Sequence, residues 1–215
     1  MPKPLYMKIK RLFDMIAALV LLIALAPMFA LVAFLIKMDS PGPALFRQER
    51  VGLGGGRFLM YKFRSMYTHT PRSVATIHLL NSERCITRVG RVLRKSSIDE
   101  LPQLINVLRG EMSLIGPRPL VPEERDIHEA RTELGAYAVR PGITGLAQVN
   151  GRDCVDAKSK AEIDAWYANN VSMWLDIKIV MFSMLCVITA RGIKEGGGAP
   201  DDMPEAEPQD YRKIV

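Results

Sequence analysis

The sequence predicts a monotopic α/β protein that is mostly helical, with a re-entrant N-terminal membrane helix, a short β-hairpin and interfacial amphipathic helices. Three observations support this prediction. A proline interrupts an uncharged apolar run near the N-terminus, two β-like stretches flank a glycine-rich turn, and a later apolar stretch is too short to span a bilayer. We expect the membrane helix in residues 1–40, a membrane-associated domain facing the cytosol in 41–195, and a flexible tail in 196–215.

The apolar run extends from Met15 to Ile36 and, at about 22 residues, could span a bilayer if it stayed straight. Pro27 removes a backbone hydrogen bond and therefore predicts a bend. Spanning helices usually carry their Lys/Arg excess on the cytoplasmic side only, whereas this run has basic residues on both sides. That arrangement favours a hairpin that enters and leaves through the same leaflet. The flanking basic residues are Lys8, Lys10, Arg11, Lys37, Arg47 and Arg50.

Three other interpretations of the run stay open. A straight spanning helix is the main rival. A signal peptide would explain the basic start and the tripeptide Ala24–Ala26, which resembles a cleavage site, although the apolar run continues well beyond it. A core helix of a soluble domain rarely runs this long without a charge.

Composition agrees with membrane attachment. The 215 residues carry a formal net charge of +6, which favours anionic partners such as lipid headgroups or phosphates. Nucleic acid is disfavoured because no recognised binding motif accompanies the charge. The three cysteines lack metal-site spacing and indicate reduced thiols facing the cytosol. The second apolar stretch, Ile179 to Ala190, suits a core or interfacial helix.

A β-hairpin is expected after the apolar run. Pro41–Pro43 is a sharp break that returns the chain to the surface. The β-like stretches Ala44–Val51 and Arg57–Phe63 follow, joined by residues 52–56, four of which are glycines. A phosphate loop is the alternative for these glycines, but no Gly-Lys-Ser/Thr follows them. The pattern therefore favours a plain turn.

The first candidate for chemistry is the carboxylate pair Asp99 and Glu100. Leucines and isoleucines recur at helical spacing from Leu101, so we expect a helix to begin close to Asp99. Either Ser97 caps it in a capping box with Glu100, or Asp99 is the cap and Pro102 falls in the first turn. In both cases the positive end of the helix dipole keeps a carboxylate ionised and favours bound phosphate. The alternative is that the pair only caps the helix.

Basic residues and rigid turns surround this pair in the sequence. Gly116–Pro119 presents Arg118 between two prolines, which suits bidentate recognition of phosphate. Residues 140–145 and 148–152 again combine turns with basic or amide donors. Together with a membrane anchor, these features suggest phosphoryl chemistry on a lipid. The basic residues just before the carboxylates are Arg88, Arg91, Arg94 and Lys95.

Several long motifs resemble the bacterial sugar transferases, the small monotopic phosphoglycosyl transferases. The segments are Tyr61–Met66, Asp99–Gly110, Gly116–Leu120 and Arg140–Arg152, and the resemblance covers nearly all of the chain between residues 10 and 191. It implies transfer of a sugar-1-phosphate from a nucleotide sugar, usually a UDP-sugar, to polyprenyl (undecaprenyl) phosphate. It also implies a Mg²⁺ cofactor, release of UMP, and a place at the cytoplasmic face of the inner membrane, in the first membrane step of glycan assembly.

The same resemblance implies the roles of individual residues. Asp99 is the expected nucleophile of a covalent phosphosugar intermediate, and Glu100 its partner; both are expected near Mg²⁺. Membrane lipids and other glycan-assembly enzymes are the further expected partners. Two alternatives remain: a ternary-complex enzyme in which Asp99 only binds metal or acts as a base, and a non-catalytic membrane adaptor. The residues expected to bind phosphate or substrate are Lys62, Arg94, Arg118, Arg140, Gln148 and Arg152.

Overall fold

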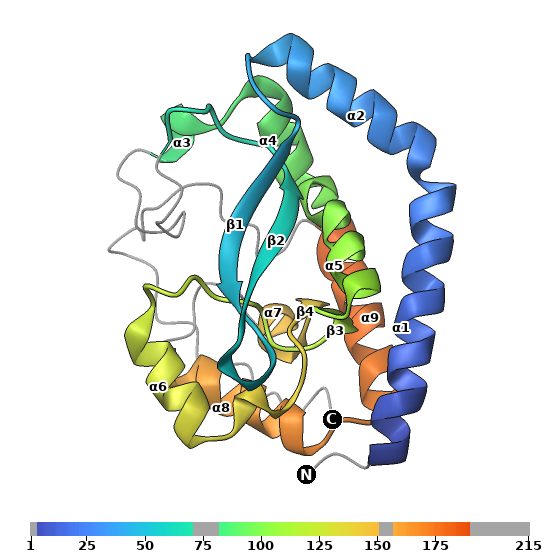
Figure 1. Ribbon diagram of the computed structural model, residues 1–215, viewed down its shortest axis with the longest axis vertical. Helices are drawn as coiled ribbons and strands as arrows, with labels where there is room; N and C mark the ends of the chain where they lie inside the picture. The colour runs from blue at the N-terminus through green and yellow to red at the C-terminus, as the bar shows by residue number, and fades with distance from the viewer. Residues whose placement is uncertain (1–3, 71–81, 151–156, 190–215) are drawn as a thin grey trace.

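The computed structural model describes residues 4–70, 82–150 and 157–189. Figure 1 shows a long bent arm, α1 followed by α2, along one side of a mixed body. Two small sheets lie in that body: the antiparallel pair β1–β2 and the parallel pair β3–β4. The arm and strands are α1 (Pro4–Ala24), α2 (Ala26–Asp39), β1 (Leu45–Val51), β2 (Arg57–Phe63), β3 (Ser113–Ile115) and β4 (Gly142–Thr144).

The remaining elements are helical, so the predicted mostly helical α/β class is confirmed. Three of them are short 3₁₀ turns, which are labelled η. They are η1 (Leu53–Gly55), α3 (Ser82–Cys85), α4 (Arg88–Lys95), η3 (Ile98–Gln103), α5 (Leu104–Arg109), α6 (Arg125–Glu133), η4 (Ala136–Ala138), α7 (Leu146–Val149), α8 (Ala157–Asn169) and α9 (Met173–Thr189).

The bend expected in the apolar run is confirmed. Helices α1 and α2 meet at 62° across a break at Leu25. Pro27 lies in the first turn of α2, where its missing N–H leaves no hydrogen bond unmade. Among the described residues, no single helix is both long and apolar enough for a membrane span, whereas this bent pair meets the criterion jointly.

Helix α1 has its polarity reversed relative to a helix of a soluble protein. Its buried residues are Lys10, Asp14 and Ala18, while large apolar side chains are exposed. Helix α9 buries Leu175, Asp176 and Ile179 and exposes apolar side chains on its other faces. The exposed large apolar residues are Leu5, Ile9, Leu12, Phe13, Met15, Ile16, Leu19, Val20, Leu21 and Ile23 in α1, and Met173, Trp174, Ile177, Val180, Met181, Phe182, Met184 and Leu185 in α9.

The predicted hairpin is also confirmed, with Phe46 opposite Lys62 in an antiparallel register. Gly54 and Gly55 in its turn adopt φ values of 61° and 78°, which favour glycine. That this is a plain turn and not a phosphate loop stays a prediction. The end of β2 is joined to the arm by Arg64, whose Nη2 donates to Ser40 O at 2.7 Å and to Ile36 O at 3.3 Å. An arginine bound to the last carbonyls of a helix satisfies groups that the helix itself cannot.

A helical segment begins close to Asp99, as expected, but its type and its capping differ from the prediction. A 3₁₀ turn begins at Ile98, and the α-helix α5 begins only at Leu104. Ser97 occupies the N-cap position with a φ of 57°, but its side chain makes no capping hydrogen bond, and Asp99 lies within the turn. Pro102 has no N–H to donate, so regular α-helical bonding is established only after it. The helix dipole is correspondingly weak at the carboxylate pair.

Two of the three cysteines, Cys85 and Cys186, are free thiols as expected. Cys154, Arg152 and the predicted tail 196–215 lie outside the described residues.

Candidate active site

Four segments meet at the carboxylate pair. Strand β2 contributes Lys62, α4 contributes Arg94, η3 contributes Asp99 and Glu100, and the turn after β3 contributes Arg118. Lys62 Nζ donates to Glu100 Oε1 at 2.9 Å, and Arg118 Nη2 donates to the same oxygen at 3.2 Å. The Asp99 side chain is buried beside them. The structure thus brings together five of the residues that the sequence singled out.

The two carboxylates have different electrostatic environments. Burial raises the pKa of Asp99, and the nearby charges of Lys62, Arg94 and Arg118 offset only part of that shift. Burial acts in the same sense on Glu100, but Lys62 and Arg118 outweigh it and hold the pKa of Glu100 well below its usual range. The expectation that a helix dipole lowers the pKa of Asp99 is therefore wrong. Burial dominates because the turn is short and Glu100 takes the direct hydrogen bonds.

Arg94 is held in place through Ser65. Its Nε donates to Ser65 Oγ at 2.8 Å. Helix α4 is capped by Thr87, whose Oγ1 accepts from Gly90 N at 2.9 Å, as expected for a threonine N-cap. A Cβ at Gly90 would lie 2.0 Å from Ser65 O, so only glycine lets α4 approach this closely. The basic side chain is thereby fixed beside Asp99.

Arg50 is a fourth cation near the pair, although its place in the sequence predicted only a basic residue flanking the apolar run. Its Nη1 donates to Pro119 O at 3.2 Å and its Nη2 to Gln48 Oε1 at 2.6 Å. Burial, followed by the charge of Arg118, lowers the pKa of Arg50 to about 10, while Glu100 acts in the opposite direction. The available signal was the alternation of Gln48 and Arg50, which puts both on one face of a strand.

Asn106 is a second residue whose role the sequence did not reveal. It is fully buried in α5. Its Oδ1 accepts from Tyr61 N at 3.0 Å, and its Nδ2 donates to Leu59 O at 2.7 Å and to Glu111 Oε2 at 2.7 Å. The side chain therefore occupies the edge of β2 as a neighbouring strand would, and fixes the residue next to Lys62 against α5.

The two proline-glycine turns pack directly on each other. Gly116 N donates to Thr144 O at 2.9 Å. A Cβ at Gly116 would lie 2.3 Å from Arg140 O, and one at Gly142 would lie 2.1 Å from Gly116 N. Both positions thus require glycine for close approach of the backbones. This contact brings the two turn motifs, residues 116–119 and 140–145, together in the fold.

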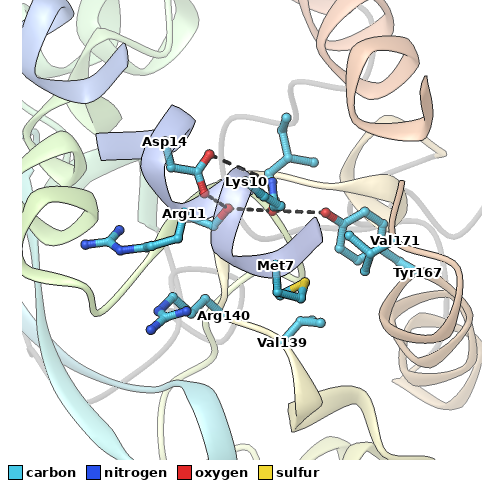
Figure 2. A pocket seen from close by; sticks show the side chains of 10 residues that line it. Met7, Lys10, Arg11, Asp14, Val139, Arg140, Tyr167 and Val171 are labelled. Atoms are coloured by element: carbon cyan, nitrogen blue, oxygen red, sulfur yellow. Dashed lines mark hydrogen bonds and ion pairs between the residues drawn. The ribbon is translucent and has the colours of Figure 1, made fainter. Parts of the chain in front are cut away.

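The other predicted substrate-binding residues make different contacts. Arg140 Nε donates to Gly110 O at 2.8 Å, and Figure 2 shows its side chain beside Arg11 of α1. Gln148 is buried and donates from Nε2 to Ile143 O at 3.1 Å. Within the described residues, the hydrogen bonds of these two side chains go to backbone carbonyls and not to the carboxylate pair. Their binding roles, and that of Arg152, stay predictions.

A second polar cluster lies where α1 meets β3, α8 and α9, around the small cavity of Figure 2. Lys10 Nζ lies 2.8 Å from Asp176 Oδ2 and 3.8 Å from Asp14 Oδ1. Tyr167 OH donates to Asp176 Oδ1 at 2.7 Å, and Ser113 Oγ donates to Asp14 Oδ2 at 2.6 Å. These contacts explain the reversed polarity of α1, because its buried charged residues, Lys10 and Asp14, face partners in the body.

The described residues contain no group of three or more His, Cys, Asp or Glu side chains that could hold a metal ion. A magnesium ion at the site would therefore depend on Asp99 and Glu100 for protein ligands. Mg²⁺ is commonly bound by one or two carboxylates, with substrate phosphates and water completing its octahedron. The donor chemistry of the pair fits that requirement.

Comparison with known proteins places this site in a family. The pattern of the bacterial sugar transferases matches residues 5–190. The undecaprenyl-phosphate glucose phosphotransferase of Komagataeibacter xylinus is 47% identical over 194 residues, which cover 85% of this chain and 36% of that protein. The UDP-glucose:undecaprenyl-phosphate glucose-1-phosphate transferase of Caulobacter vibrioides is 45% identical over 189 residues, covering 84% and 70%.

The uncharacterized sugar transferase EpsL of Bacillus subtilis is 40% identical over 189 residues, which cover 88% of this chain and 92% of that protein. The chain thus spans little more than a third of the Komagataeibacter relative but nearly all of the Bacillus one. The family expected from the motifs is confirmed by these matches. The chain belongs to the bacterial sugar transferase family and is a transferase.

Proposed function

We propose that this transferase moves a sugar-1-phosphate from a UDP-sugar to polyprenyl (undecaprenyl) phosphate, releases UMP, and does so through a covalent intermediate on Asp99. The observation that carries the proposal is the carboxylate pair, with Asp99 buried and Glu100 half-buried, beside the cations Lys62, Arg94 and Arg118. Cations in excess of carboxylates suit an ionised diphosphate. The names of the Komagataeibacter and Caulobacter relatives, which refer to undecaprenyl phosphate, support the choice of acceptor.

In the first step, an Asp99 carboxylate oxygen attacks the sugar-bearing phosphorus of the UDP-sugar. A new Asp–O–P bond forms, and the bond to the oxygen bridging the two phosphates breaks, so UMP leaves with that electron pair. Lys62 and Arg118 neutralise charge on the phosphate oxygens as the nucleophile approaches. Burial of Asp99 keeps water away from the intermediate.

In the second step, a phosphate oxygen of the polyprenyl phosphate attacks the same phosphorus. The Asp–O–P bond breaks, the Asp99 carboxylate is regenerated, and the product is a polyprenyl diphosphate sugar. Splitting the transfer in this way allows a soluble donor and a lipid acceptor to use one site in turn. Asp99 and Glu100 would hold Mg²⁺, which when bound supplies further charge neutralisation on the diphosphate.

The membrane part of the proposal is supported by the reversed polarity of α1. Its apolar side chains face outward, whereas Lys10 and Asp14 face the body. A helix with that pattern is stable where its outer surface meets lipid. We place the bent pair α1–α2 in the cytoplasmic leaflet of the inner membrane, entering and leaving through the same face, with α9 against the lipid surface. Membrane lipids, and other enzymes of glycan assembly, are then its further partners.

The test is a panel of UDP-sugars with purified protein in lipid nanodiscs. UMP release that depends on polyprenyl phosphate is expected for the correct sugar. With UDP-sugar but no acceptor, intact mass spectrometry should show a sugar-phosphate adduct on Asp99. Asp99→Asn should abolish both turnover and adduct, and Glu100→Gln should impair both. Asp126→Asn, an exposed carboxylate of α6, is the matched control and should leave them unchanged.

The alternatives give different results. Turnover with ternary-complex kinetics and no adduct would make Asp99 a metal ligand or a base. Absence of UMP release with every UDP-sugar would leave a membrane adaptor. Ping-pong kinetics together with the adduct would establish the covalent route.

A further inference from the structure

Hydrogen bonds from other segments fix the backbone of the turn that carries Arg118. Each of the four consecutive carbonyl oxygens from residue 117 to 120 accepts a hydrogen bond from a different residue. The donors, in order along the turn, are Gly142 N at 2.9 Å, Arg131 Nη1 at 2.9 Å, Arg50 Nη1 at 3.2 Å and Val51 N at 3.0 Å. Three elements outside the turn, β1, β4 and α6, therefore fix its backbone.

External donors matter here because the turn cannot hold itself. Pro117 and Pro119 have no N–H, so the turn has few backbone donors of its own. The proline rings fix φ at two positions, but they do not fix how the turn is oriented relative to Glu100. Arg118 Nη2 reaches Glu100 Oε1 at 3.2 Å from a side chain that is 44% exposed. The carbonyl of Arg118 is the closest anchoring point to that side chain.

Arg131 binds this carbonyl through Nη1, one of the two terminal nitrogens of its guanidinium. The other terminal nitrogen, Nη2, forms an ion pair with Asp164 Oδ2 of α8. Both side chains are almost entirely buried, at 3% and 1% exposure of the residues. Apolar residues of similar volume are often at least as stabilising as a buried ion pair, so its contribution to stability alone does not explain the pair. A planar guanidinium bound through both of its terminal nitrogens instead holds its two partners in a fixed geometry.

We propose that Arg131, oriented by Asp164, is a positioning residue that fixes Arg118 for phosphate binding. This role rests on the proposed function, because its test measures the proposed activity on a UDP-sugar. Contacts run from Asp164 of α8, through Arg131 of α6, to the carbonyl of Arg118, and none of them touches the reacting atoms. A small displacement of a phosphate-binding group is enough to slow a reaction by orders of magnitude.

The informative variant is Arg131→Lys. A lysine keeps the charge opposite Asp164, but its single ammonium cannot bind Asp164 and the Arg118 carbonyl in the fixed geometry of the planar guanidinium. The variant is expected to fold, with kcat/KM for the UDP-sugar reduced roughly tenfold because the turn has lost an anchor. Arg125→Lys is the matched control: an exposed arginine of the same helix, with kcat/KM expected unchanged.

A double-mutant cycle with Arg118→Ala separates positioning from general stability. If Arg131 acts through Arg118, R131K should change kcat/KM by less than about twofold when Arg118 is already absent. Where R118A turns over too slowly, the same cycle is measured on the dissociation constant for UDP. Thermal midpoints of all four proteins are recorded alongside.

Two results would overturn the proposal. One is full activity of R131K with Arg118 present. The other is an equal loss in both backgrounds, which would show that Arg131 only stabilises the fold. Failure of the wild-type protein to release UMP from any UDP-sugar is a distinct outcome, because it rejects the proposed function before Arg131 is considered.

Discussion

Replacing Lys10 with methionine should destabilise the protein strongly although the two side chains have similar volumes. Lys10 is buried, and its Nζ lies 2.8 Å from Asp176 Oδ2 and 3.8 Å from Asp14 Oδ1. Removing one partner of a buried ion pair costs about 3–5 kcal/mol, because a buried charge is left uncompensated. Tyr6 and Tyr167 still donate to Asp176, so we expect a value near the lower end, about 3 kcal/mol.

The assay is thermal unfolding of the protein in a single detergent. For a chain of this size, 1 kcal/mol moves the midpoint by about 2–4 °C, so Lys10→Met should lower it by roughly 6–12 °C. Lys8→Met, at an exposed position of the same helix, should leave the midpoint unchanged. The double variant Lys10→Met/Asp176→Asn should recover part of the loss, since the uncompensated carboxylate is then removed.

A Lys10→Met midpoint equal to that of Lys8→Met would contradict a stabilising ion pair at Lys10. A double variant less stable than Lys10→Met alone would contradict it too. Either result would mean that water or a rearranged side chain compensates Asp176, and that the cluster does not hold α1 against the body.

Three further predictions concern the site and the membrane helix. Arg118→Lys should reduce turnover at least roughly tenfold, since a charge-assisted contact is worth about 1.5–3 kcal/mol; near-normal initial rates would show that the turn is structural only. Chelation of divalent cations should stop UMP release and added Mg²⁺ should restore it, whereas full activity in the chelator would exclude a metal requirement. Single cysteines near Met7 and at the exposed Met38 should both react from the cytosolic side, and Pro27→Leu should move the helix towards spanning; one periplasmic end in the unaltered helix would disprove re-entrance.

The features that the sequence predicted correctly depend on local signals. Pro27 within an apolar run predicted the bend, and the glycines after Val51 predicted the hairpin turn. The grouping of Asp99 and Glu100 with Lys62 came from motif resemblance, and the structure brings the three together. Each inference required only a few neighbouring residues, or a pattern already associated with a family.

The features that the sequence did not reveal depend on contacts between distant segments. Asn106 is a polar residue in a mostly apolar helix, and nothing local indicates that it pairs with the edge of β2. Arg131 and Asp164 lie in different helices, and their link to Arg118 appears only when α6 and α8 pack together. A helical segment does begin beside Asp99, but it is a 3₁₀ turn, and α-helical bonding starts only at Leu104 because Pro102 has no N–H to donate.

Contacts of α1 with the body link the proposed membrane helix to the segments that carry the proposed phosphate-binding groups. Arg11 donates to Val107 O at 2.6 Å and to Leu108 O at 3.3 Å, so it satisfies carbonyls at the end of α5, the helix that continues from the carboxylate pair. Asp14 accepts from Ser113 at the start of β3, the strand that leads into the turn of Arg118. One helix therefore supports both the segment of Asp99, the proposed nucleophile, and the turn of Arg118, the proposed phosphate-binding residue. With α1 lying in the membrane, its depth would fix the height of the reacting groups above the lipid phosphates.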